Sequence, residues 1–118
     1  MIVETELQLS KVQSVTLDAK GYGEVRIGPS KPGERWKVTI MNTANDGSLQ
    51  PIHKVFRGPA GHGQQLDYTR SGKGDTSPTE IELRTGDYLT ATWSGGTVGS
   101  QSMFTVEGIQ YLVGKRAY

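Results

Sequence analysis

The stretch TEIELRTGDYLTATWSGGTVGSQSMFTVEGIQY, residues 79–111, decides the fold class of this chain. Apolar residues alternate with polar ones in residues 80–84, and again where Leu89, Ala91 and Trp93 alternate with tyrosine and threonines. A period of two residues is the spacing of a β-strand with one buried face. The stretch therefore predicts strands that each turn one face toward a core.

Two turns divide this stretch into three strands. Thr85-Gly86-Asp87 interrupts the first alternation, and residues 94–99, SGGTVG, supply glycines that accept a positive φ. Residues 103–106 resume a β-prone run, which we expect to pair back on the preceding strand as an antiparallel hairpin. A shift of one residue would send the apolar side chains to the opposite face, so the pattern fixes the register. We expect a second sheet to cover this apolar face.

The composition indicates one small all-β domain. The 118 residues, 34% of them hydrophobic, suffice for a single core over residues 1–118 and are too few for two ordinary domains. Sixteen glycines favour short strands joined by tight turns. No window of a dozen residues carries helical apolar spacing free of glycine and proline, so no helix is expected.

Charge and cysteine usage exclude several partners and chemistries. The formal net charge is +1 with acids and bases interspersed, so neither nucleic acid nor an anionic membrane is an expected partner. The absence of cysteine excludes disulfides and thiolate chemistry. The N-terminal segment lacks the features of a signal peptide, and no run approaches the ~20 apolar residues that cross a bilayer. A soluble protein made in the cytoplasm is expected.

The first segment, residues 1–12, fits either an extended N-terminal arm or an edge strand. Its apolar residues from Val3 onward share one parity, and glutamates and a glutamine hold the other. An arm or an edge strand is free to bind another chain. The candidate partner-binding residues are therefore Ile2, Val3, Leu7 and Leu9.

Further strands are expected at a spacing of roughly ten residues, among them 14–17, 23–27, 35–41 and 53–57. Residues 60–78, rich in glycine, serine, aspartate and threonine, are expected to form an exposed polar loop. About eight strands predict an antiparallel β-sandwich of Greek-key or jelly-roll type. The predicted core residues are Trp36, Val38, Ile40, Leu89, Ala91, Trp93, Phe104 and Val106.

No pattern in the sequence indicates catalysis, a metal or a cofactor. The two histidines, His53 and His62, have neither an HxH nor an HExxH spacing, and no serine has a GxSxG setting. Glu80 and Glu82 alternate with aliphatic residues, which is typical of a solvated strand face rather than a glycosidase pair. The protein is therefore not expected to be an enzyme.

Five motifs follow one another in a fixed order: GERWKV (33–38), VFRG (55–58), LDYT (66–69), SGKGDTS (71–77) and LRTGDYLTATWSGG (83–96). Together they resemble a pattern in small virion proteins of tailed phages that infect actinobacteria, and residues 103–108 match the strand that follows there. The resemblance covers about residues 33–108. It implies a structural virion component and leaves open its position on the capsid, the neck or the tail.

The resemblance and the absence of a catalytic pattern together favour a capsid decoration protein that binds the outer surface of the assembled shell. Its expected partners are the major capsid protein or other virion proteins and copies of itself, and its expected place is the virion, after synthesis in the host cytoplasm. A neck or tail component is the first alternative. A carbohydrate- or receptor-binding β-sandwich, with Tyr68 and Tyr88 in an aromatic platform, is the second.

Overall fold

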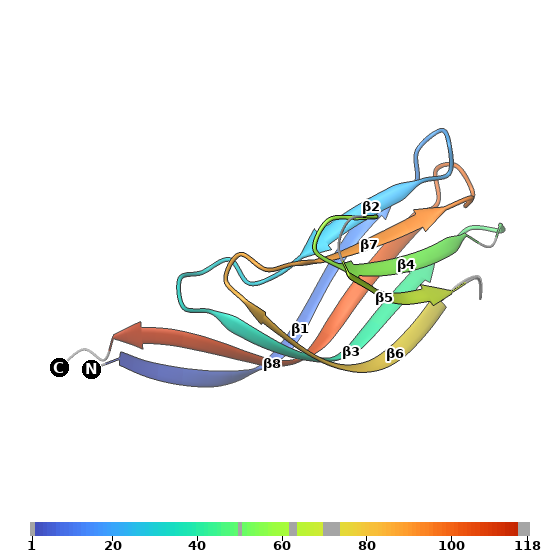
Figure 1. The fold of residues 1–118 in the computed structure, drawn as a ribbon. Coiled ribbons are helices and arrows are strands. Elements are labelled where there is room, and N and C mark those ends of the chain that lie inside the picture. Colours follow the sequence, from blue (N-terminus) through green and yellow to red (C-terminus); the bar gives the residue numbers. More distant parts are fainter. Residues whose placement is uncertain (1, 50, 62–63, 70–73, 116–118) are drawn as a thin grey trace.

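The computed structural model describes residues 2–49, 51–61, 64–69 and 74–115. Within these residues all regular structure is β-strand; no helix is found, and so none that is long and apolar enough to cross a membrane. Eight strands form two four-stranded antiparallel sheets that pack as two layers (Figure 1). The strands are β1 (Ile2–Thr16), β2 (Gly23–Ile27), β3 (Arg35–Asn45), β4 (Ile52–Arg57), β5 (Gln64–Thr69), β6 (Gly74–Arg84), β7 (Leu89–Ser94) and β8 (Gln101–Lys115).

The order of the strands identifies the sandwich as a jelly roll. One sheet, here called sheet A, has the order β1-β8-β3-β6, and the other, sheet B, has the order β2-β7-β4-β5. Apart from β4 and β5, consecutive strands lie in different sheets, so the chain crosses between the layers at nearly every turn. Two four-stranded sheets connected in this way are the jelly-roll arrangement. The predicted all-β sandwich of about eight strands is confirmed.

The predicted hairpin between residues 89–93 and 103–106 is wrong. β7 pairs with β2 and β4 in sheet B, whereas β8 pairs with β1 and β3 in sheet A. Both strands bury an apolar face, and these faces meet across the space between the layers rather than side by side in one sheet. The glycine-rich segment 95–99 is therefore a connection between sheets and not a hairpin tip.

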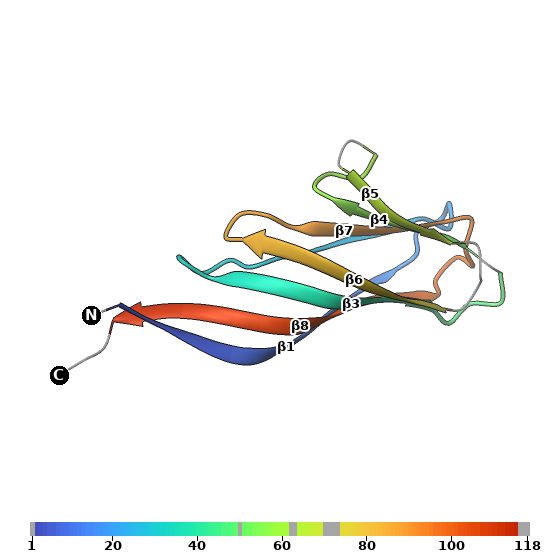
Figure 2. The same ribbon diagram turned by 60° about the horizontal axis from the view of Figure 1, so that its bottom comes forward.

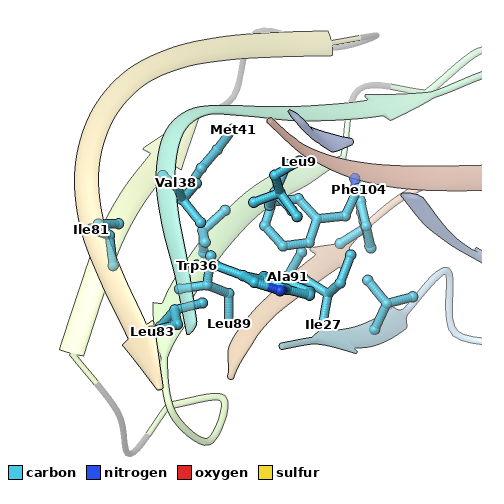
Figure 3. Packing of buried hydrophobic residues seen from close by; sticks show 14 of the residues in the cluster. Leu9, Ile27, Trp36, Val38, Met41, Ile81, Leu83, Leu89, Ala91 and Phe104 are labelled. Atoms are coloured by element: carbon cyan, nitrogen blue, oxygen red, sulfur yellow. The ribbon is translucent and has the colours of Figure 1, made fainter. Parts of the chain in front are cut away.

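A single hydrophobic core fills the space between the two sheets. Figure 3 shows labelled side chains from both layers pointing into it. Seven of the eight residues assigned to the core from the sequence are buried: Trp36, Val38, Leu89, Ala91, Trp93, Phe104 and Val106. Other buried hydrophobic residues of the cluster are Leu9, Leu17, Val25, Ile27, Met41, Val55, Ile81 and Leu83.

The eighth residue, Ile40, was assigned to the core incorrectly. The pairing of β3 with both β6 and β8 shifts register between Val38 and Ile40, which marks a β-bulge. A bulge inserts one residue and reverses the parity of the side chains that follow. Ile40 consequently lies on the outer face of sheet A, 37% exposed, and Met41 takes its place in the core.

Two expectations about loops and ends are also settled by the strand boundaries. Residues 60–78 are not one loop, because β5 lies within them and β6 begins at Gly74. The N-terminal segment is an edge strand rather than a free arm, since β1 pairs with β8 from Ile2↔Lys115 to Thr16↔Gln101. Figures 1 and 2 both show the outer ends of β1 and β8 extending past the rest of the sandwich. There residues 2–5 pair with residues 112–115, beyond the first β3–β8 pair, Arg35↔Tyr111.

Candidate partner-binding surface

The described residues contain no group of histidine, cysteine, aspartate or glutamate side chains that could hold a metal ion. His53 is buried in sheet B, where its Nδ1 lies 2.8 Å from the hydroxyl of Thr43. Its ring and the Trp93 ring form a T-shaped pair with their centroids 6.2 Å apart. His62 lies outside the described residues. The candidate functional features are surface features of sheet A, because most of the large exposed hydrophobic side chains of the described residues lie on its strands.

The outer face of sheet A carries exposed apolar side chains from three adjacent strands. Val12 on β1 is 56% exposed, Met103 on β8 is 47% exposed, and Ile40 lies on β3. Thr105 lies directly opposite Val12, and Ala44 lies directly opposite Met103. The small side chains of Thr105 and Ala44 are therefore the neighbours of the exposed Val12 and Met103. We call these five residues the outer-face patch.

The β-bulge adds a hollow to the outer-face patch. Ile40 and Asn42 on β3 and Thr105 and Glu107 on β8 line a concavity of about 320 Å³. The hydroxyl of Thr39, the residue within the bulge, donates a hydrogen bond to the backbone carbonyl of Glu107 at 3.3 Å. Exposed apolar side chains beside a hollow make this face a candidate contact surface.

The same face is charged toward the end where the chain termini lie. The Arg35 guanidinium donates to the carboxylate of Glu4 at 3.1 Å and to that of Glu82 at 2.9 Å, and it stacks on the Tyr111 ring at 3.8 Å. These contacts join β1, β8, β3 and β6 across the sheet. Hydrogen bonding to Glu4 raises the pKa of Arg35, so this cation stays charged at every physiological pH.

A buried carboxylate holds the inner face together at this end. Glu34, just before β3, accepts hydrogen bonds from the backbone N–H groups of Ser30 and Lys31 at 3.0 Å each, from the Trp36 indole at 2.7 Å and from the Gln110 amide at 2.6 Å. Burial by itself raises the pKa of Glu34, but the four donors outweigh it and lower the pKa to about 2. The ionised form thus ties the 30–34 loop to β3 and β8.

Replacing Glu34 with glutamine is expected to remove an acid-sensitive part of the stability. Because the folded pKa of about 2 lies below the ordinary value of 4.5, ionised Glu34 stabilises the fold above about pH 4.5, and this contribution is lost as the pH falls toward 2. The shift corresponds to about 3 kcal/mol. Denaturant unfolding between about pH 6 and 2 should show a shallower loss of stability in Glu34→Gln than in the wild type.

Glu80→Gln is the matched control for this prediction. Glu80 is exposed on β6 and forms an ion pair with Lys37 at 3.4 Å. Exposed pairs of this kind contribute little to stability. Equal pH dependence of unfolding in Glu34→Gln and the wild type would contradict the assignment of the acid sensitivity to Glu34.

The four candidate partner-binding residues from the sequence do not act as one group. Leu9 was assigned to partner binding incorrectly, because it is fully buried in the core opposite Gly108 of β8. Leu7, two residues earlier and on the same face, is 45% exposed, since sheet B no longer covers β1 there. Ile2 and Val3 belong to β1 by their backbone pairing, and their side chains lie outside the described residues. Deleting residues 1–10 would uncover the core, so point substitutions are the better test of this segment.

The residues of the predicted aromatic platform are only partly described. Tyr88 lies between two hollows of about 380 and 350 Å³, which it lines with Gly86 and Asp87, and its ring lies under the Arg26 guanidinium at 4.9 Å. The side chain of Tyr68 is outside the described residues. One aromatic ring beside polar groups is therefore present at the end of the sandwich near the 85–88 turn.

Comparison with known proteins leaves the family of this chain open. No family model matches it, and no curated protein matches it. Among solved structures, a Bacillus endospore appendage protein from disulfide-linked pili is similar, with 15% identity, a TM-score of 0.48, and coverage of 92% of this chain and 89% of that one. The Drosophila NLP core, described for pentamer formation and histone binding, has 10% identity, a TM-score of 0.40, and coverage of 81% and 96%. At these values neither neighbour bears on function.

Proposed function

We propose that this chain is a structural component of a phage virion, a decoration protein that binds the outer surface of an assembled capsid shell. The observation that carries the proposal is the outer-face patch, in which Val12, Ile40 and Met103 are exposed on the outer face of sheet A. Exposed apolar side chains gathered on one face mark a contact surface. The resemblance of residues 33–108 to actinobacteriophage virion proteins favours a virion component, and the capsid shell is the partner that we propose for this surface.

A rigid sandwich suits this function. The outer-face patch stands on the strands β1, β8 and β3, which are locked by pairing along their length, and the Arg35 contacts fix the far end of the same face. Binding therefore requires little ordering of the protein, which lowers the entropic cost of association. Sheet B and its connections then face away from the shell, where exposed polar turns are tolerated.

Met103→Lys is expected to weaken attachment to the shell at least about tenfold, because an ammonium group would be desolvated at the centre of the contact. The measurement is occupancy of purified shells that were assembled without this protein, by co-sedimentation over a range of protein concentrations. Since Met103 is partly exposed, the variant should keep the wild-type unfolding midpoint.

Val98→Lys is the matched control. Val98 is 61% exposed on the 95–99 connection and is not part of the outer-face patch, so its replacement should leave occupancy unchanged. Wild-type occupancy by Met103→Lys would contradict the proposal, as would equal losses in both variants. A saturating number of copies near a dozen per particle would assign the protein to the neck instead. Depletion onto cell-wall glycans that is lost in Tyr88→Ala would favour the carbohydrate-binding alternative.

A further inference from the structure

The four sheet edges of this molecule are protected against strand addition to different degrees. β2 and β5, the edges of sheet B, have only 5 and 6 residues. β6, one edge of sheet A, contains Pro78, which lacks a backbone donor. β1, the other edge of sheet A, runs for 15 residues without proline or glycine, and β8 is its only strand neighbour among the described residues. Long unprotected edges of this kind accept another strand.

We infer that β1 pairs antiparallel with β1 of a second copy of this chain, about a two-fold axis perpendicular to sheet A that passes close to Leu7. In such a pair the two strands keep their side chains on matching faces, so one residue must lie opposite its own copy. The positions of the charged and apolar residues along β1 determine which residue lies opposite its own copy.

The glutamates exclude a pairing centred nearer the N-terminus. A centre at residue 4 or 6 places Glu4 or Glu6 opposite its own copy, and a centre at residue 5 places Glu4 opposite Glu6. Like charges directly opposite each other destabilise a strand pair. A centre at Leu7 instead places Glu4 opposite Ser10 and Glu6 opposite Gln8, so no two carboxylates face each other.

Lys11 excludes a centre farther along the strand. Lys11 shares the inner face with Leu9, and its register partner Val106 is buried, so it is an inward-pointing charge on an edge strand. Natural edge strands use such charges to stop pairing. A centre at Leu7 leaves Lys11 at the end of the ladder, whereas a centre at Gln8 or Leu9 would place it farther inside, opposite Thr5 or Leu7. The pairing therefore extends over about residues 3–11.

This arrangement also accounts for the exposure of Leu7. On the inner face, Leu7 has Gln110 as its register partner on β8 and no strand on its other side within the described part of sheet A. In the dimer the two Leu7 side chains lie against each other, flanked by Thr5 and Leu9 of both copies. Sheet A becomes a continuous eight-stranded sheet, and both outer-face patches face the same way.

Cysteine crosslinking tests the register directly, because the chain contains no cysteine. Leu7→Cys should form an intermolecular disulfide under mild oxidation, since the paired Cα atoms of opposed residues lie about 5 Å apart. Gln13→Cys is the matched control: it is exposed, and on the same strand and face, but the two copies would lie roughly 40 Å apart in this register. Sedimentation should give the wild type twice the 12.8 kDa monomer mass, and Leu7→Asp the monomer mass with unchanged circular dichroism.

Three results would overturn the inference: a wild-type monomer at millimolar concentration, a dimer that persists in Leu7→Asp, or faster crosslinking through Gln13→Cys than through Leu7→Cys. These measurements use purified protein without shells and do not depend on the proposed function. Met103→Lys should dimerise like the wild type. Failure of dimerisation with intact shell binding would reject only the β1 pairing, and the reverse result would reject only the decoration function.

Discussion

Trp93→Ala is expected to lower the free energy of unfolding by about 3–5 kcal/mol, the usual range for truncation of a buried large aromatic side chain. Trp93 is fully buried near the end of β7, an inner strand of sheet B, with Gly23 of β2 opposite on one side and His53 of β4 opposite on the other. Neither Gly23 nor the His53 ring can fill the cavity that would remain after removal of the indole. Urea unfolding monitored by far-ultraviolet circular dichroism measures the loss.

Trp93→Phe separates packing from hydrogen bonding in this prediction. The indole N–H of Trp93 is buried and finds no acceptor among the described residues. Phenylalanine keeps an aromatic ring and removes this unpaired donor, so it should cost clearly less than alanine. An unfolding midpoint of Trp93→Ala equal to that of the wild type would refute the assignment of Trp93 to the core.

Gly108→Ala is expected to lower the free energy of unfolding by about 3 kcal/mol or more. This is at or above the upper end of the usual range for substitutions that overpack a site. A Cβ atom at Gly108 would collide with the backbone carbonyl oxygen of Lys37 and would lie 3.0 Å from its carbonyl carbon. Gly108 pairs with Val38 at the start of the bulge, so relief of the collision requires β3 and β8 to separate there. Thermal and denaturant unfolding both measure the effect.

Gly86→Ala is the control for backbone conformation alone. Gly86 has φ +95°, in the left-handed region, and a Cβ there would meet nothing within 4 Å. Its replacement should cost about 1–2 kcal/mol through conformation only. A cost for Gly108→Ala no larger than that for Gly86→Ala would show that β3 and β8 adjust freely at the bulge.

Alternation in the sequence predicts strands and their buried faces, and it does not identify their neighbours. Parity alone predicts that Leu89, Ala91 and Trp93 lie on a buried face, because one parity of the strand is apolar. The same pattern is equally compatible with pairing to β8 in one sheet or with packing against β8 across a core. Which sheet each strand joins depends on which apolar faces cover each other in the folded protein. This depends on the whole chain and not on one strand.

The candidate surface was predictable only where parity is unbroken. Ile40 continues the sequence alternation of Trp36 and Val38. The bulge that turns Ile40 outward begins where Val38 pairs with Gly108, which is distant in sequence. Leu7 and Leu9 have the same residue type and parity, yet they differ in exposure because sheet B covers β1 only from about Leu9 onward. Exposure of this kind is set by the extent of the opposite sheet, which local sequence does not encode.

The pairing of the first strand with the last has a consequence for how the chain folds. Each β1–β8 pair joins a residue at or before position 16 to one at or after position 101. β3 pairs with β8 across a shorter but still long separation, from Asn45↔Ser102 to Arg35↔Tyr111. Closing loops of this length costs chain entropy before the strand pairs form and stabilise the fold. Folding should therefore be slow, in the range of milliseconds to seconds for all-β domains of high contact order. During synthesis β1 emerges from the ribosome long before β8, so its apolar residues stay unpaired until β8 has been made. In this interval the nascent chain is most prone to aggregate with other chains.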